Sequence, residues 1–189
     1  MTSVGLGHAA SPSDDAAPTT PSQASPRSRQ YTWSDPSIPA AAAARMSGLE
    51  FLQSIGAGTL ARPPALDTLA IDPVEVQEGR VIFEMTPAEW HYNPIGGVHG
   101  GVLATLADTA LGCAVHSRLP AGTGYSTLEV KLNFVRPVTT ATGRIRCVAQ
   151  VLSLGRRVAT ADARITDSNG KLYAHATTTC LLFPMETGQ

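Results

Sequence analysis

Asp108 gives the strongest chemical signal in the sequence, because it is the only charged residue between positions 99 and 116. The surrounding segment, residues 96–116, is rich in Ala and Leu, which favours a helix, and apolar residues occupy every side of that helix. We therefore expect a buried helix, and an isolated buried carboxylate must be paired, hydrogen-bonded or protonated. Asp108 could instead lie at a solvated edge or bond to Thr105 or Thr109. A functional carboxylate is the better interpretation, because the rest of the helix offers no polar face.

A second signal lies at the start of the same helix, in the run His99-Gly100-Gly101. Free backbone N–H groups point out of a helix N-terminus, where the helix dipole favours negative charge. Glycine also lets a substrate approach the backbone closely. The run therefore has the features of an oxyanion hole. A tight loop-to-helix turn would use the same glycines, so the run by itself is weak evidence.

The spacing of these two features bears on the number of chains in a site. Gly100 and Asp108 are eight residues apart, so about 12 Å separates them along one helix. They cannot both act on the same carbonyl group within one chain. If both are catalytic, Asp108 must face the Gly100 of a second protomer, and the minimal active unit is a homodimer.

Asn93 and His99 flank the loop that leads into the helix. The Asn93 amide could help to bind a carbonyl group or to position a water, or it could form an Asx-turn before Pro94. The residues alone do not decide between these two roles. His99 could donate a hydrogen bond to the loop or to a substrate oxygen, and we expect a structural or orienting role for it rather than that of a general base.

The elements around this helix follow from the pattern of apolar residues. Residues 38–55 repeat apolar side chains at three- and four-residue steps, which predicts a helix that ends at Gly56, and Pro63-Pro64 marks a loop. Residues 69–76 and 81–85 are β-branched and alternating, which predicts a hairpin. Further strands are predicted over residues 125–135, 143–152, 157–166 and 172–183.

The order of a hairpin, one long helix and a meander of four strands indicates an α+β fold, with an antiparallel β-sheet wrapped around one long central α-helix. One sheet leaves part of such a helix uncovered, so a second copy of the chain is the natural cover. The burial of the helix and the spacing of the site residues thus predict the same dimer.

Composition narrows the classes of protein. The chain has 189 residues, 43% hydrophobic and 15% charged, which suits one domain with a buried core. Its formal net charge of −1 gives no basis for binding nucleic acid through bulk charge.

The sequence also bears on the location and organisation of the chain. No apolar run suits a membrane span, and no secretory signal is visible. Cys113, Cys147 and Cys180 lie far apart, which predicts reduced thiols and a cytoplasmic protein. Residues 1–35 are rich in Ser and Pro, which predicts a disordered tail before a domain at residues 36–185.

Several short motifs occur together in residues 40–183. They are the Asn93-x5-His99-Gly100-Gly101 loop, Leu106-Ala107-Asp108 on the helix, the strand TLEVKLNFVRP from Thr127 to Pro137, Gly155-Arg156, and Asp167 with Gly170. Their combination resembles the PaaI-type hotdog-fold acyl-CoA thioesterases. The resemblance implies a hotdog fold and hydrolysis of an aryl- or medium-chain acyl-CoA. It also implies a homotetramer built from two dimers.

The resemblance implies a role for each residue of the candidate site. Asp108 would be the catalytic carboxylate, either as nucleophile or as general base on water, and the Gly100 N–H would polarise the thioester carbonyl. Asn93 and His99 would support that carbonyl or the attacking water. Thr127 would help to orient the water or the carboxylate.

The resemblance also implies where coenzyme A binds. Arg136 and the turn of Gly155, Arg156 and Arg157 match regions that contact its nucleotide part, and arginine suits phosphate by charge and geometry. Ordinary surface charge is the alternative interpretation of these arginines. The helix over residues 38–55 lies outside the family's core pattern and is a candidate cover for part of the acyl pocket.

Other functions fit the residues less well. A hotdog hydratase would need an Asp and a His close together on the active loop, whereas here they are nine residues apart, with His99 first. No G-x-S-x-G elbow of a serine hydrolase occurs. The histidines lack the spacing of zinc ligands, so neither a metal nor another cofactor is expected. A non-catalytic acyl-CoA binding or sensing protein is the alternative, although such a binder gains nothing from a buried carboxylate.

Overall fold

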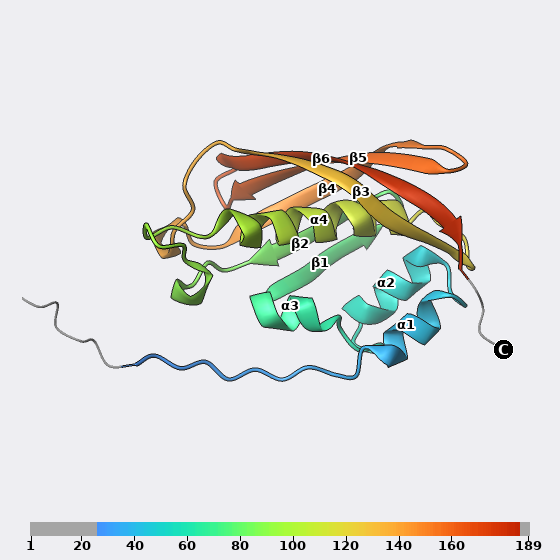
Figure 1. Cartoon of the computed structure of the whole chain (residues 1–189), viewed down its shortest axis with the longest axis horizontal. Coiled ribbons are helices and arrows are strands. Elements are labelled where there is room, and N and C mark those ends of the chain that lie inside the picture. The colour runs from blue at the N-terminus through green and yellow to red at the C-terminus, as the bar shows by residue number, and fades with distance from the viewer. Residues whose placement is uncertain (1–25, 186–189) are drawn as a thin grey trace, which may run out of the picture. The chain divides into compact units, whose positions relative to one another are not determined.

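The computed structural model describes residues 26–185 of the chain (Figure 1). The helices are α1 (Ser37–Ala43), α2 (Gly48–Gly56), α3 (Pro64–Leu69) and α4 (Gly100–His116), with short 3-10 turns at Glu89–His91 and Thr140–Thr142. The strands are β1 (Ile71–Gln77), β2 (Arg80–Met85), β3 (Thr123–Phe134), β4 (Ile145–Leu154), β5 (Val158–Asp167) and β6 (Leu172–Pro184). The predicted sequence of a hairpin, a long helix and four further strands is confirmed.

Within the described residues, six strands form one antiparallel sheet in the order β1-β2-β4-β5-β6-β3. The predicted hairpin is confirmed as β1 and β2. The prediction of a simple meander after the helix was wrong for one strand, because β3 lies at the far edge of the sheet beside β6. The reason is that α4 joins β2 to β3 and carries the chain across the face of the sheet (Figure 1).

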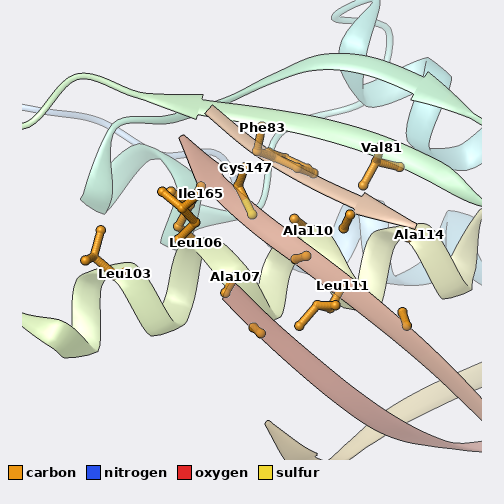
Figure 2. Close-up of a cluster of buried hydrophobic side chains, with 14 of the residues drawn as sticks. Val81, Phe83, Leu103, Leu106, Ala107, Ala110, Leu111, Ala114, Cys147 and Ile165 are labelled. Atoms are coloured by element: carbon orange, nitrogen blue, oxygen red, sulfur yellow. The ribbon is translucent and has the colours of Figure 1, made fainter. Parts of the chain in front are cut away.

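α4 packs across the inner face of the sheet and forms the centre of the core (Figure 2). The fully buried side chains of α4 include Leu106, Ala107, Ala110, Leu111 and Ala114. Opposite them, the strands contribute small side chains: Ala149, Ala159, Ala161, Ala163, Ala174 and Ala176. These alanines lie among larger side chains such as Leu106, Phe83 and Ile165, and the mixture of small and large side chains lets the helix pack on the sheet at the density of a protein interior.

One face of α4 is open in this chain, which differs from the burial on every side that the sequence suggested. Gly101 and Asp108 are exposed, and Thr105 and Thr109 are half-buried. The sheet covers only the opposite side of the helix, so the Asp108 carboxylate reaches solvent here rather than lying in the core.

Two helices, instead of the one predicted over residues 38–55, precede the sheet. Ser47 separates them, because its hydroxyl accepts a hydrogen bond from the Glu50 N–H while the Glu50 carboxylate accepts one from the Ser47 N–H. Gly48 then donates its N–H to the Leu119 carbonyl at 3.0 Å. A Cβ atom at Gly48 would overlap the His116 carbonyl oxygen, so only glycine fits where α2 meets the end of α4.

The structure adds one short helix that the sequence did not predict. α3 begins at Pro64, where the sequence indicated only a loop, and proline is tolerated in the first turn of a helix. Ala70 ends the helix in the left-handed conformation, with φ of 51°.

The predicted tail, residues 1–35, lies mostly outside the described residues. Its described part, residues 26–35, contains no helix or strand, and the limits of the tail and of the domain at residues 36–185 stay a prediction. No helix between residues 26 and 185 is both long and apolar enough to cross a membrane.

Candidate active site

Asp108 lines a cavity of about 260 Å³ that lies beside the open face of α4. Most of the lining is apolar, and it comes from α2, from α3 and the residue before it, from the first two strands, and from α4 and β3. The lining residues are Phe51, Leu52, Ile55, Pro63, Ala65, Leu66, Pro73, Val76, Phe83, Asp108, Thr109, Cys113, His116, Tyr125 and Thr127. A carboxylate beside an apolar cavity can meet the reacting carbon of an acyl group whose remainder is buried.

Thr127 holds the Asp108 carboxylate in place. Its hydroxyl donates a hydrogen bond to Asp108 Oδ1 at 2.9 Å. The register of β3 against β6 shifts between Thr127 and Glu129, and such a bulge re-aims the side chains beside it. The two residues are nineteen positions apart in the sequence, so the sheet creates this contact.

Beside Asp108, the cavity is lined by three other titratable side chains, and burial keeps them uncharged near neutral pH. They are Cys113, His116 and Tyr125. Burial lowers the pKa of His116 and raises that of Tyr125 well above its ordinary value. Burial, with a smaller effect of the Asp108 charge, raises the pKa of Cys113 to about 12. The Cys113 thiol therefore stays protonated and is a poor nucleophile. Cys113, Cys147 and Cys180 are free cysteines, as predicted.

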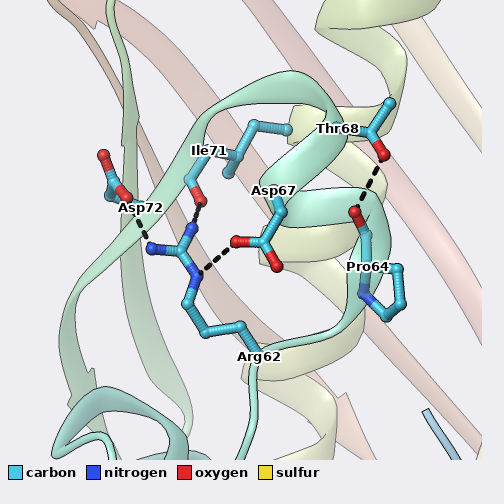
Figure 3. Close-up of polar contacts among 6 residues, drawn as sticks. All are labelled: Arg62, Pro64, Asp67, Thr68, Ile71 and Asp72. Atoms are coloured by element: carbon cyan, nitrogen blue, oxygen red, sulfur yellow. Dashed lines mark hydrogen bonds and ion pairs between the residues drawn. The ribbon is translucent and has the colours of Figure 1, made fainter. Parts of the chain in front are cut away.

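Arg62 fixes one wall of the cavity by joining α3 to β1 (Figure 3). Its guanidinium lies 2.9 Å from Asp72 Oδ1 and 3.3 Å from Asp67 Oδ1, and it also donates to the Ile71 carbonyl oxygen. A guanidinium with one partner in α3 and two in β1 restrains the chain between these two elements. The restrained segment includes Pro63, Ala65 and Leu66, which line the cavity.

The N-terminus of α4 has the backbone arrangement of an anion site. His99 is the N-cap, and its Nδ1 accepts a hydrogen bond from the Gly101 N–H at 2.8 Å. The N–H groups of Val102 and Leu103 donate to the His99 carbonyl. Among residues 26–185, no group accepts a hydrogen bond from the Gly100 N–H. His99 thus shapes the turn, and the Gly100 N–H at the start of the helix is left without an acceptor in the described part of the chain.

Asn93 forms the Asx-turn that the sequence left open as one of two roles. Its side-chain oxygen accepts hydrogen bonds from the Ile95 N–H at 3.0 Å and from the Gly97 N–H at 3.1 Å. Asn93 also lines a second cavity, of about 560 Å³, together with Gly100 and Arg136. The loop thus uses the amide oxygen, while the side chain still borders a space next to the Gly100 N–H.

The structure divides the predicted catalytic residues between the two cavities. Asp108 and Thr127 line the cavity of about 260 Å³, whereas Asn93 and Gly100 line the one of about 560 Å³. Eight residues of continuous helix, about 12 Å, separate Gly100 from Asp108. The described chain does not bring them to one carbonyl group.

The structure also separates the predicted arginines for coenzyme A. Arg156 and Arg157 are exposed and line a third cavity, of about 610 Å³, beside the start of β3. Gly155 closes the β4–β5 turn by donating its N–H to the Val158 carbonyl at 2.9 Å. Arg136 lies with Asn93 and Gly100 instead and donates to the Leu172 carbonyl. No group of three or more His, Cys, Asp or Glu side chains that could hold a metal ion occurs in the described part of the chain.

The sequence named the helix over residues 38–55 as a candidate cover for the acyl pocket, but it singled out none of the side chains that complete the Asp108 cavity. Phe51, Leu52 and Ile55 of α2 form a small apolar cluster of their own and face the cavity. Their helical periodicity predicted an amphipathic helix, but periodicity does not show where a helix docks. His116 and Tyr125 were placed on their elements without a role. Gly48, which lets α2 approach α4, was the available signal for this docking.

Comparison with known proteins identifies the family. Residues 95–174 match the model of the thioesterase superfamily. Over 102 residues, the chain is 32% identical to acyl-coenzyme A thioesterase 13 of Homo sapiens, an alignment that covers 53% of this chain and 71% of that protein. A solved thioesterase from Haemophilus influenzae matches with a TM-score of 0.62 at 25% identity, over 72% of this chain and 91% of its own. The PaaI protein of Escherichia coli, from the phenylacetic acid degradation operon, shares the fold with a TM-score of 0.64 at 23% identity, over 74% and 97%.

The antiparallel sheet against one long helix, together with these matches, defines a hotdog-fold thioesterase. The chain belongs to the thioesterase superfamily and is a thioester hydrolase. The predicted hotdog fold and the resemblance to PaaI-type thioesterases are confirmed.

Proposed function

We propose that this protein hydrolyses the thioester of an aryl- or medium-chain acyl-CoA to the free acid and coenzyme A, with Asp108 as the catalytic carboxylate. The carrying observation is that Asp108, held by Thr127, lines an otherwise largely apolar cavity. That cavity suits an acyl group, because it removes apolar surface from water. The likeness to human acyl-coenzyme A thioesterase 13 supports an acyl-CoA substrate.

Asp108 can perform the reaction in either of two ways. As a nucleophile, the carboxylate adds to the thioester carbonyl, the C–S bond breaks to release the coenzyme A thiolate, and water then hydrolyses the mixed anhydride. As a general base, it takes a proton from water, the resulting hydroxide adds to the carbonyl, and the departing thiolate takes up a proton. In both routes the Thr127 hydroxyl orients the carboxylate by its hydrogen bond.

The complete site is proposed to contain two chains. Negative charge that develops on the carbonyl oxygen needs a donor, and the Gly100 N–H at the start of α4 suits this role. Because Gly100 and Asp108 line separate cavities, the donor is proposed to come from the Gly100 of a second copy, with Asn93 and His99 shaping the loop that presents it. Each dimer would then hold two equivalent sites.

The surface of the chain supports this assembly. One face of α4 is open, and β3 is an edge strand with unpaired backbone groups on its outer side. Leu128 and Phe134 on this strand are 59% and 55% exposed. A second copy placed on α4 and β3 would cover these apolar side chains. A homotetramer of two such dimers and a cytoplasmic location, in keeping with the free cysteines, are parts of the same proposal.

Coenzyme A is proposed to bind through the arginines. Arg156 and Arg157, in the turn closed by Gly155, are exposed beside a cavity of about 610 Å³, where their guanidinium groups can pair with phosphates. Arg136 borders the cavity of Gly100, so in a dimer it would approach the same substrate from the other chain.

Asp108→Asn and Asp108→Ala test the function. Release of coenzyme A from acyl-CoA, followed with a thiol reagent, should fall by at least about a hundredfold in kcat, because the reaction loses its nucleophile or base. Asp162→Asn is the matched control. It neutralises a carboxylate on β5, next to Ala161 and Ala163, which face α4, so Asp162 points to the opposite side of the sheet. Turnover near the wild-type rate in both Asp108 variants would refute the assignment, as would the absence of any hydrolysis by the wild type, which is the outcome expected of a binding or sensing protein.

A further inference from the structure

Thr178 places a hydroxyl group in an otherwise apolar part of the core. It is 2% exposed and lies on the face of β6 that packs toward α4, next to Ala174, Ala176 and Cys180. Valine has nearly the same shape as threonine and would fill this position without a polar atom. A buried hydroxyl is unfavourable unless it is hydrogen-bonded, so the bond that Thr178 makes is the feature to explain.

That bond goes to the bulge in β3. The Thr178 hydroxyl donates to the Glu129 carbonyl oxygen at 2.7 Å. The pairing of β3 with β6 skips Leu128, so the bulge lies between Thr127 and Glu129. A bulge interrupts the backbone ladder beside it, and a side-chain donor can then hold a carbonyl group that the regular pairing no longer fixes.

The bulge decides which side chains of β3 face α4. Side chains alternate between the two faces of a regular strand, so Thr127 and Val130, three residues apart, would point to opposite faces. Here Thr127 reaches Asp108 on α4 while Val130 packs against the core on the same side of the sheet. The Glu129 carboxylate accepts a hydrogen bond from the Thr179 hydroxyl at 2.9 Å, on the outer face. Without the bulge, a strand that kept Val130 in the core would turn Thr127 away from Asp108.

Cys180 contacts both threonines and links them. It pairs with Thr127 across the two strands, and its Sγ lies 4.0 Å from Thr178 Oγ1. Burial raises the pKa of the Cys180 thiol, and hydrogen bonds with the Thr178 and Thr127 hydroxyls partly offset that effect. Contacts therefore run without a break from Thr178 through Cys180 and Thr127 to the Asp108 carboxylate.

We propose that Thr178 is a positioning residue for thioester hydrolysis, whose hydrogen bond to the Glu129 carbonyl holds the β3 bulge that aims the Thr127 hydroxyl at Asp108. The inference rests on the proposed function and adds to it a residue that acts without touching the substrate. Because Thr178 acts through Thr127, its loss can reduce turnover by no more than the loss of the Thr127 hydroxyl does.

Thr178→Val tests this role, because valine keeps the shape of threonine and removes only the hydroxyl. We expect kcat for benzoyl-CoA or hexanoyl-CoA, whichever the wild type hydrolyses faster, to fall by about three- to tenfold, because a displaced carboxylate reacts more slowly. KM should change by less than about twofold, because Thr178 does not line the acyl cavity.

Two further variants serve as controls. Thr178→Ser keeps the hydroxyl and should retain kcat within about twofold of the wild type. Thr179→Val removes the next hydroxyl along β6, which bonds the side chain of Glu129 instead of its carbonyl, and it should leave kcat unchanged.

A double variant distinguishes positioning from a general weakening of the sheet. Thr127→Val already lacks the hydroxyl that Thr178 positions, so adding Thr178→Val should lower kcat by less than about twofold further. A weakened sheet would instead multiply the two single losses. If Thr178→Val does not fold, Thr178→Cys takes its place, because a thiol of similar size is only a weak donor, and the same comparisons apply.

The outcomes separate this inference from the proposed function. Wild-type kcat in folded Thr178→Val would overturn the inference, as would an equal loss in Thr178→Ser or Thr179→Val, or multiplied losses in the double variant. Each of these results would leave the function of Asp108 standing. If the wild type hydrolyses neither thioester, or if Asp108→Asn keeps the wild-type rate, the proposed function fails and the inference fails with it.

Discussion

Replacing Gly100 by proline removes one hydrogen-bond donor from the proposed site and changes little else. Gly100 is the first residue of α4, a position where proline is tolerated because its missing N–H has no partner within the helix. The preceding residue, His99, has φ of −60° and ψ of 133°, the extended conformation that a residue before proline adopts. A Cβ atom at Gly100 would lie 2.9 Å from Phe134 Cζ, the outer end of a side chain, so the Phe134 ring must shift slightly in any variant that adds this atom.

Gly100→Ala is the matched control, because alanine adds the same Cβ atom but keeps the N–H. If this N–H stabilises the oxyanion, Gly100→Pro should lose about 3 to 4 kcal/mol of transition-state stabilisation, or roughly a hundred- to a thousandfold in kcat. Gly100→Ala should lose less than about tenfold, because it disturbs only the Phe134 contact.

Initial rates of coenzyme A release, together with the melting temperature of each variant, give the result. Equal rates for Gly100→Pro and Gly100→Ala, in proteins that melt near the wild-type temperature, would refute the Gly100 N–H as the oxyanion donor. A large loss in both would place the effect in the packing of Phe134 instead.

Three further predictions follow from the same geometry. An equimolar mixture of Asp108→Asn and Gly100→Pro chains, unfolded and refolded together, should regain about a quarter of the wild-type activity, because about half of the dimers pair unlike chains and each then holds one intact site. A mixture no more active than either variant would contradict the two-chain site. Thr127→Val should lower kcat by roughly tenfold, because it removes a hydrogen bond to a charged group, and should change the melting temperature little; an unaltered kcat would count against Thr127 as a positioning residue. Burial lowers the pKa of His116 below 6.5, so as the pH falls the unfolded chain binds a proton at this residue before the folded chain does. The free energy of unfolding should therefore decrease as the pH falls below about 6.5. The free energy of unfolding in urea, measured at about pH 7.5 and about pH 5.5, should decrease less in His116→Gln than in the wild type. Equal decreases would contradict a buried, neutral His116.

Much of the fold could be predicted from the sequence, because the relevant signals are local. The alternation of apolar residues indicated each strand, and the Ala- and Leu-rich run indicated α4, within a few residues of the observed bounds. The break between α1 and α2 was missed, because Ser47 and Glu50 form a capping box inside an apolar pattern that continues on both sides. α3 was missed because a pair of prolines indicates a loop as readily as a first helical turn.

For the candidate site, too, some features could be predicted from the sequence and others could not. The distance between Gly100 and Asp108 follows from the rise of a helix, so the sequence was sufficient to predict that two chains are needed if both residues act on one carbonyl group. The contact between Thr127 and Asp108 depends on where β3 lies in the sheet, and no local pattern contains that information. The sequence also suggested a fully buried Asp108, because apolar composition does not distinguish a face covered by the same chain from one left open for another.

By itself, then, the sequence determined the elements, the lone carboxylate on α4 and its spacing from the helix N-terminus, because these depend on periodicity and on residues close together in the chain. Only the tertiary structure decided that β3 lies at the far edge of the sheet and that α2 encloses a cavity ending at His116 and Tyr125. The structure alone also shows that Arg136 borders a different cavity from Arg156 and Arg157. These features depend on contacts between distant segments, which form when apolar faces pack together and which no single segment specifies.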